Sequence, residues 1–291
     1  MRLGGGLVPP LSRKGASMSE NSALASVSVG IIGAGAMGAS IASGLVESGA
    51  MAASQVTICD HNAPKLEALA AKCGVGTVAT AEEVLAAGTD VVVLAVKPQV
   101  LGALLEKSAS ALAGKLVVSI AAGVSLATLE GALPGARVVR VMPNLPVAVR
   151  SGASAVCGGA SASDADTELV RQMFAALGSA KVMREDQLDA EGAVVGCAPA
   201  FFALMVDALT RAGVKSGLRA ADAREMVNAT MLGVAEMLAE SDEHPRAYME
   251  RVTSPGGTTA AALYELEPAL TEGCYAAVDA ALERTAELAR G

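Results

Sequence analysis

The chain has 291 residues, of which 52% are hydrophobic and 18% are charged. This composition excludes a mainly disordered chain, and the length accommodates one large domain or two modest ones. The formal net charge of −8 makes nucleic acid and anionic membrane poor partners, so we expect neither. The five cysteines are scattered, and neither His61 nor His244 has a second His or a Cys at metal-ligand spacing. We therefore expect free thiols, a reducing cytoplasmic compartment and no metal site.

Residues 1–26 precede the first predicted element and lack the apolar core and clean cleavage site of a signal peptide. We expect them to form a disordered N-terminal extension, with Met18 as an alternative translation start. The uncharged stretch Asn21–Val46 is long enough to span a bilayer, but five glycines interrupt it. A buried strand, a glycine turn and a helix explain this stretch better than a membrane helix.

Strand and helix patterns alternate over the first part of the chain. Continuous apolar runs predict five strands of a parallel sheet that is covered on both faces, at Val27–Gly33, Gln55–Asp60, Asp90–Val96, Lys115–Ile120 and Arg137–Met142. Helices are expected at Ala36–Gly49, near Pro64–Cys73 and at Pro98–Ser108. Two more strands, near Ala153–Cys157 and Ala180–Arg184, flank a helix at Asp164–Leu177. The alternation is typical of an α/β, doubly wound Rossmann sheet, which we assign to residues 27–185.

From about residue 186 the strand signal disappears. Apolar side chains fall on one face of a helix at 201–212 and of a second at 223–238. Two further helices are expected at Thr259–Glu267 and Cys274–Leu288. Residues 186–291 are therefore predicted to form a C-terminal all-helical domain.

The segment Gly33-Ala34-Gly35-Ala36-Met37-Gly38 matches the GxGxxG pattern of dinucleotide-binding loops. It follows the first predicted strand and opens the first helix, which is the context that the motif requires. Gly33 permits the tight turn, Gly35 lets the backbone approach a diphosphate, and Gly38 lets the helix pack against the sheet. The alternative is a chance cluster in a chain with 31 glycines.

Asp60 ends the second predicted strand, 22 residues after Gly38. A carboxylate at this place binds the adenine ribose hydroxyls of NAD and repels a 2′-phosphate, so Asp60 favours NADH over NADPH. The alternative is an Asp that caps the helix after Asn62. The segments Ala95-Val96-Lys97-Pro98 and Ala121-Ala122-Gly123 leave two further strands at the edge where such sheets bind ligands. Lys97 meets cofactor or substrate charge there, or is a solvated surface residue.

The segment Thr253-Ser254-Pro255-Gly256-Gly257-Thr258-Thr259 precedes a predicted helix. Ser-Pro starts a turn, the glycines expose the backbone, and the N–H groups of a helix N-terminus attract anions. The segment predicts a cradle for a small carboxylate, with an N-capped loop between helices as the alternative. Dehydrogenases of hydroxy acids often need a His or Lys base, and His244 is the only histidine in the helical domain. An imine substrate relaxes that need because its nitrogen brings its own proton.

These motifs resemble those of the pyrroline-5-carboxylate reductase family, and the resemblance runs from about Val27 to about Arg290. The most specific motifs are Ala121–Val124, Arg140–Asn144, Ala212–Val214, Gly217–Leu218, His244–Pro245 and Thr253–Thr259. The resemblance implies reduction of 1-pyrroline-5-carboxylate to L-proline with NADH or NADPH, the last step of proline biosynthesis. It also implies that the helical domain binds substrate and forms a homodimer, and dimers of this family often assemble further into decamers.

The resemblance assigns roles to the candidate residues. Backbone N–H groups of Gly257, Thr258 and Thr259 would hold the substrate carboxylate, and the Thr259 hydroxyl, as the catalytic group, would bond the ring nitrogen. Ser254 and Gly256 would complete the substrate loop. The cofactor would be held at its diphosphate, ribose and nicotinamide by Ile32, Gly33, Ala34, Gly35, Ala36, Met37, Gly38, Asp60, Ala95, Val96, Lys97, Pro98, Ala121, Ala122 and Gly123.

Three segments depart from the family pattern and leave the substrate range open. The chain has Gly196-Cys197-Ala198-Pro199-Ala200-Phe201 for Gly-Ser-Gly-Pro-Ala-Tyr, Asn144-Leu145-Pro146 for Asn-Thr-Pro, and Met249 for Lys or Arg. A reductase of the β-hydroxyacid dehydrogenase type is a competing hypothesis, but it needs a catalytic Lys early in the helical domain, and none stands between Ala190 and Val214. Two more hypotheses stay open, a non-catalytic dinucleotide-binding protein and a reductase of a related cyclic imine.

Overall fold

The computed structural model describes residues 23–290. Residues 1–22 of the predicted N-terminal extension, with Met18, lie outside the described residues. Leu24–Ser26 form a short 3-10 helix (η2) in which Leu24 is buried. The Gln55 side chain donates hydrogen bonds to the carbonyls of Leu24 at 2.9 Å and Val27 at 2.8 Å. The prediction of disorder is therefore wrong for the last residues of 1–26, because a buried leucine and a side-chain amide fix them.

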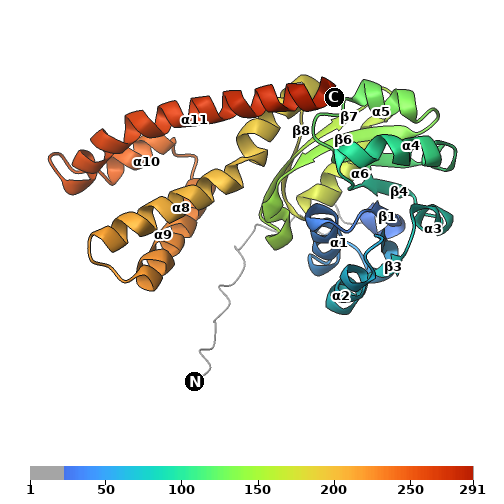
Figure 1. Ribbon diagram of the computed structural model, residues 1–291, viewed down its shortest axis with the longest axis horizontal. Coiled ribbons are helices and arrows are strands. Elements are labelled where there is room, and N and C mark those ends of the chain that lie inside the picture. Colours follow the sequence, from blue (N-terminus) through green and yellow to red (C-terminus); the bar gives the residue numbers. More distant parts are fainter. Residues whose placement is uncertain (1–22, 291) are drawn as a thin grey trace. The chain divides into compact units, whose positions relative to one another are not determined.

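The chain divides into two compact units (Figure 1). One unit is Ala200–Tyr275, and the other comprises the described residues up to Pro199 together with those from Ala276. We describe each unit by itself.

The unit that begins the chain contains an eight-stranded sheet in the order β3-β2-β1-β4-β5-β6-β7-β8. Neighbouring strands are parallel except β6 and β7, which are antiparallel. The strands are β1 (Val29–Ile32), β2 (Val56–Cys59), β3 (Gly76–Val78), β4 (Val91–Leu94), β5 (Leu116–Ser119), β6 (Arg137–Pro143), β7 (Gly152–Gly158) and β8 (Gly178–Val182). The predicted doubly wound α/β fold is confirmed; only β3, a three-residue edge strand, was missed.

Six α-helices connect these strands, and a seventh, α7, follows the last strand. They are α1 (Ala36–Glu47), α2 (Ala63–Cys73), α3 (Ala81–Ala86), α4 (Pro98–Leu112), α5 (Leu126–Ala132), α6 (Asp164–Ala175) and α7 (Glu185–Glu191). The short 3-10 helices η3 (Ala53–Gln55) and η4 (Leu145–Val149) complete the connections. The sequence did not predict α3 and α5, because one or two turns are too short for a periodic pattern. Their caps, Thr80 and Ser125, are the signals that mark them.

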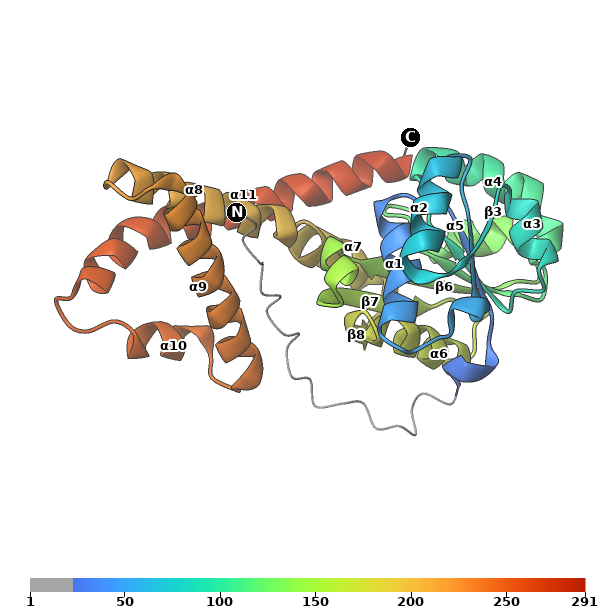
Figure 2. The same cartoon turned by 90° about the horizontal axis from the view of Figure 1, so that it is seen from below.

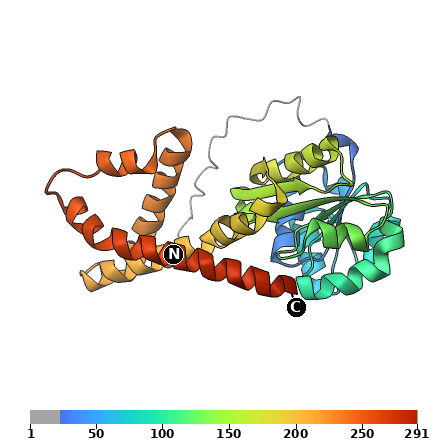
Figure 3. The ribbon, with the colours of Figure 1, turned by 90° about the horizontal axis from the view of Figure 1, so that it is seen from above.

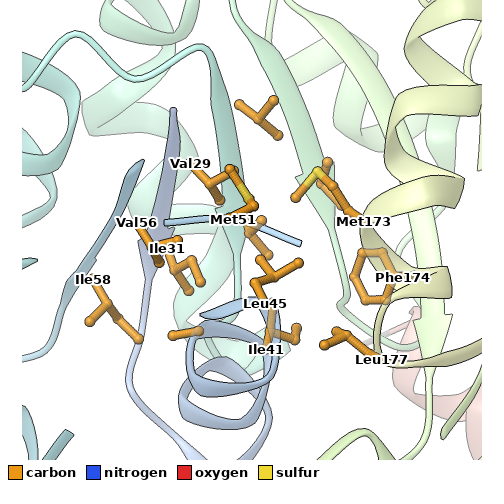
Figure 4. Packing of buried hydrophobic residues seen from close by; sticks show 14 of the residues in the cluster. Val29, Ile31, Ile41, Leu45, Met51, Val56, Ile58, Met173, Phe174 and Leu177 are labelled. Carbon is orange, nitrogen blue, oxygen red and sulfur yellow. The ribbon is translucent and has the colours of Figure 1, made fainter. Parts of the chain in front are cut away.

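Helices cover both faces of the sheet (Figure 3). Residues of α1, α2 and α6 pack on one face, and residues of α3, α4, α5 and α7 pack on the other. Figure 4 shows Ile41 and Leu45 of α1 between Ile31 of β1 and Phe174 of α6. Strands β1, β4 and β5 are buried along their whole length. This double coverage explains why these strands read as continuous apolar runs.

The helical part consists of the π-helix η5 (Gly192–Gly196), α8 (Ala198–Lys215), α9 (Ala220–Glu240), α10 (Pro245–Arg251) and α11 (Thr258–Arg290). The prediction of two separate helices after residue 258 is wrong, because α11 runs continuously through Pro268. A proline removes one intrahelical hydrogen bond and bends a helix, but it does not oblige the helix to end.

The unit Ala200–Tyr275 has almost no core of its own. Of its residues, all of which the structure describes, only Ala223 is buried. A groove of about 690 Å³ is lined by apolar side chains of α8, α9 and α11. The helical stretch Glu185–Lys215 contains an 18-residue window with a mean hydropathy of 1.8, so it is also long and apolar enough to cross a membrane by length and composition alone. An apolar surface of this extent marks an interaction site.

Candidate active site

The glycine loop between β1 and α1 has the geometry that close packing demands. Gly33 has φ of 109°, and a Cβ there would lie 2.7 Å from the carbonyl oxygen of Ala95. A Cβ on Gly38 would overlap the carbonyl oxygen of Gly33. Both positions therefore require glycine for the turn and for the approach of α1 to the sheet.

Gly35 is different, because apart from its two chain neighbours no atom of the described residues lies within 4 Å of the place where its Cβ would be. It is the N-cap of α1, and no side chain caps the helix. The N–H groups of Ala36, Met37 and Gly38 stand in the first helical turn, where the helix offers them no acceptor. Open space before free N–H groups fits the diphosphate of a dinucleotide.

Asp60 holds the glycine loop to the end of β2. Its side chain is only 10% exposed. One carboxylate oxygen accepts the N–H of Ala34 at 2.9 Å, and the other accepts the N–H of Asn62 at 2.9 Å. Asn62 itself caps α2 by accepting the N–H of Lys65. The alternative that Asp60 caps α2 is therefore wrong, since the next residue but one performs that role.

The register of the sheet brings the other cofactor candidates to the same edge. Ile32 of β1 pairs with Cys59 of β2 and with Leu94 of β4, and Leu94 pairs with Ser119 of β5. The strand order reverses at β1 and β4, which is the switch point where such sheets bind ligands. The glycine loop, Asp60 and the loops after β4 and β5 therefore border one site.

The two loops contribute different surfaces. Ala95 and Val96 are half-buried, while Lys97 is exposed at the N-cap of α4, which Pro98 opens. After β5, Ala121 is buried and Ala122 is exposed. Small apolar side chains thus border most of the space next to β4 and β5, with the Lys97 ammonium in solvent.

The Ser254–Thr259 loop belongs to the unit Ala200–Tyr275. Gly256 has φ of 70°, and the N–H of Gly257 donates to the carbonyl of Ser254 at 3.0 Å. Helix α11 begins at Thr258, so the N–H groups of Thr258 and Thr259 lie in its first turn. The Gly257 N–H is thus engaged within the turn, and the two threonines supply the free donors for an anion.

Two polar side chains were not among the site residues that the sequence predicted. Asn144, at the end of β6, is buried; it donates to the carbonyl of Val195 at 3.2 Å and accepts the N–H of Ala153 at 2.9 Å. Glu191 stands at the end of α7, where burial raises its pKa to about 7, and one of its carboxylate oxygens has no partner. A π-helix follows it, a feature often found at functional sites that no sequence pattern announces.

Metal ligands, cysteine thiols and histidines are the remaining groups that could do chemistry. Within residues 23–290, no group of three or more His, Cys, Asp or Glu side chains is placed to hold a metal ion. Burial raises the pKa of the Cys59 thiol to about 11, so it stays protonated at neutral pH. His244, in the helical unit, accepts the N–H of Arg246 at 3.1 Å and caps α10.

Two family models match the chain. The one described as pyrroline-5-carboxylate reductase dimerisation matches residues 185–288, which include α8 to α11. The one described as NADP oxidoreductase, coenzyme F420-dependent, matches residues 28–123, which include the glycine loop. The first match explains the exposed apolar surface of the helices as an oligomerisation surface, and the chain forms a homo-oligomer.

Relatives cover nearly the whole chain. The pyrroline-5-carboxylate reductase of Methanosarcina acetivorans is 37% identical over 265 residues, which are 90% of this chain and 98% of that protein. The Arabidopsis thaliana enzyme is 37% identical over 267 residues, covering 91% and 96%. Among solved structures, the Coxiella burnetii pyrroline-5-carboxylate reductase is 33% identical with a TM-score of 0.83, covering 90% and 98%. The Plasmodium falciparum pyrroline carboxylate reductase with NADP bound is 28% identical with a TM-score of 0.82, covering 91% and 98%. This chain belongs to the pyrroline-5-carboxylate reductase family.

Proposed function

We propose that this protein reduces 1-pyrroline-5-carboxylate to L-proline by transfer of a hydride from NAD(P)H to the carbon of the C=N bond. One observation carries the proposal: this member of the family has two sites for anions, one for the cofactor and one for the substrate. The open N-terminus of α1 at Gly35 suits a diphosphate, and the first turn of α11 suits a small carboxylate. The reaction is the last step of proline biosynthesis, and we place it in the cytoplasm.

The cofactor is held by the edge of the sheet. When bound, NAD(P)H supplies the hydride. The segment Ile32–Gly38 receives the diphosphate at Gly35, and Ala95–Pro98 with Ala121–Gly123 border the ribose and nicotinamide. Asp60 places a carboxylate at the end of β2, beside the loop, where it favours ribose hydroxyls over a 2′-phosphate. The resulting preference is for NADH.

The substrate is oriented by the start of α11. The N–H groups of Thr258 and Thr259 bind the carboxylate, and the turn made by Ser254, Gly256 and Gly257 shapes the approach. The Thr259 hydroxyl bonds the ring nitrogen and fixes the C=N bond for attack. The nitrogen carries its own proton, so the hydride completes the amine and no protein acid is needed. Orientation and binding then supply most of the catalysis.

Cofactor binding and substrate binding are assigned to two different domains. We assign residues 27–185 to the Rossmann domain and 186–291 to the helical domain that binds substrate and forms the homodimer, with a decamer as a higher assembly. The groove of about 690 Å³ and the exposed apolar side chains of α8 and α9 support a partner copy at this surface. Light scattering of the purified protein distinguishes a dimer from a decamer.

A substrate comparison tests the function. Purified protein is mixed with NADH or NADPH and with 1-pyrroline-5-carboxylate, a six-membered cyclic imino acid, or no substrate, and cofactor oxidation and proline are measured. In a parallel assay, NAD⁺ is offered a 3-hydroxy acid. We expect oxidation with the five-membered imine and proline as product. Turnover confined to the six-membered ring or to the hydroxy acid would replace the proposed substrate, and cofactor binding without any turnover would favour a regulatory protein.

A further inference from the structure

A guanidinium group is buried between strand β6 and helix α7. The Arg140 side chain, on β6, is only 3% exposed. Its guanidinium lies 2.7 Å from a carboxylate oxygen of Asp189 and 3.5 Å from Oε1 of Glu185. Both acids belong to α7, one turn apart. Figure 2 labels helix α7 and strand β6. Because a buried charge is costly without partners, the pair ties α7 to β6.

Glu185 has a second contact beyond the ion pair. Its Oε1 also accepts the N–H of Leu126 at 2.5 Å. Leu126 is the first residue of α5, and its N–H is one that a helix cannot satisfy internally. Ser125, the N-cap, accepts the N–H of Thr128 and leaves Leu126 to Glu185. One carboxylate oxygen therefore joins the buried Arg140 to the start of α5, in a charge-assisted hydrogen bond.

The start of α5 is also the end of the loop that follows β5. The loop Ala121–Gly123 runs from the carboxyl end of β5 toward Ser125, and Gly123 takes φ of 74°. Ala121 and Leu126 belong to the same buried cluster as Leu188 of α7. The loop is thus held at one end by the sheet and at the other by Glu185, which is the one side chain among residues 23–290 bonded to the Leu126 N–H.

We propose that Glu185 is a positioning residue for the nicotinamide end of the cofactor. Drawn by the Arg140 guanidinium, its carboxylate fixes the first turn of α5 and thereby the loop Ala121–Gly123. Glu185 acts through the loop and touches neither substrate nor cofactor. The inference rests on the proposed function, because that assigns Ala121–Gly123 to the border of the nicotinamide.

Three variants separate positioning from general stability. Glu185→Ala removes both contacts of the carboxylate. Glu185→Gln keeps an oxygen that accepts the Leu126 N–H but loses the charge that attracts Arg140. Asp186→Ala is the matched control, because Asp186 is the next residue of α7, is exposed, and pairs with Arg184 at 2.8 Å.

Two ligands report on the two ends of the site. NADH contains the nicotinamide, whereas ADP-ribose has the same diphosphate and adenosine but no nicotinamide. In Glu185→Ala we expect NADH affinity to fall about 10-fold, with ADP-ribose affinity unchanged, since one hydrogen bond to a charged group is lost. The misplaced nicotinamide should lower kcat by about 10- to 100-fold. Glu185→Gln should lose NADH affinity by a smaller but measurable factor, because it keeps an acceptor for the Leu126 N–H but loses the charge that draws it to Arg140. Asp186→Ala should resemble the wild type.

The outcomes are decisive in each direction. Equal loss of NADH and ADP-ribose affinity in Glu185→Ala, or no loss of either, would overturn the positioning role. If Glu185→Ala does not fold, Glu185→Gln carries the test: a loss confined to NADH and kcat supports the proposal, and wild-type values for both refute it. Failure of the proposed function is seen separately, as wild-type protein that binds NADH but does not turn over 1-pyrroline-5-carboxylate.

Discussion

Gly35→Val should abolish cofactor binding while leaving the fold intact. Gly35 has φ of −66° and ψ of 179°, which any residue adopts, and a Cβ there meets no atom of the described residues within 4 Å beyond its two chain neighbours. The structural cost is the poorer N-cap, about 1 kcal/mol. The valine side chain instead fills the space before the first turn of α1. Losing two hydrogen bonds between N–H groups and a charged diphosphate costs about 3–6 kcal/mol, which raises the Kd at least about 100-fold.

The assay pairs calorimetric titration of NADH with thermal unfolding, and Gly38→Ala is the control. A Cβ on Gly38 overlaps the backbone oxygen of Gly33, so this variant should lose about 1–3 kcal/mol of folding stability. The two glycines thus predict opposite signatures, binding lost with Tm kept for Gly35→Val, and Tm lowered for Gly38→Ala. Wild-type NADH affinity in a folded Gly35→Val protein would refute the placement of the diphosphate on α1.

Three further predictions concern single side chains. Thr259→Ala should lower kcat/KM by about 10- to 1000-fold through loss of a transition-state hydrogen bond, whereas Thr258→Ala keeps its N–H and should change little; equal losses would remove the hydroxyl from the mechanism. Asp60→Ala should weaken NADH more than NADPH in parallel titrations, and an equal effect would leave Asp60 only its bonds to the N–H groups of Ala34 and Asn62. Burial raises the pKa of Glu191 to about 7, so the native state retains a proton that the unfolded state has released, and stability falls as pH rises from about 4.5 to about 7. Glu191→Gln should therefore raise the Tm at about pH 8 and not below about pH 4.5, and a difference independent of pH would contradict this.

The sequence predicted the sheet well because strands that are buried on both faces consist of consecutive apolar residues, which are easily recognised. The strands β1, β4 and β5 are rich in β-branched residues and buried along their whole length, and the strong glycine motif follows the first of them. The sequence wrongly predicted two helices in place of α11, because a proline such as Pro268 usually marks a helix end. In a helix as long as α11, the free-energy cost of one lost hydrogen bond is small compared with the stability of the whole helix. The short helices α3 and α5 carry caps but too few turns for a period.

The candidate site was predictable in its residue types but not in its hydrogen bonds. The motif named Gly35 and Asp60 correctly as members of one edge, because strand register follows from the fold. The sequence could not show that Asp60 accepts the Ala34 N–H, or that the Gly257 N–H donates to the carbonyl of Ser254. These contacts depend on turn conformation, which residue type alone does not specify. The link from Arg140 through Glu185 to Leu126 joins segments far apart in the chain, and no local pattern reveals it.

Deuterium transfer tests the central claim most directly. NADH deuterated at both C4 positions of the nicotinamide is oxidised by the protein with 1-pyrroline-5-carboxylate, and the product is examined by mass spectrometry and NMR. The hydride of the proposed reaction goes to the carbon of the C=N bond, so the account predicts proline with one deuterium at C5. Proline without deuterium, deuterium at another carbon, or no proline while NADH binds would contradict it.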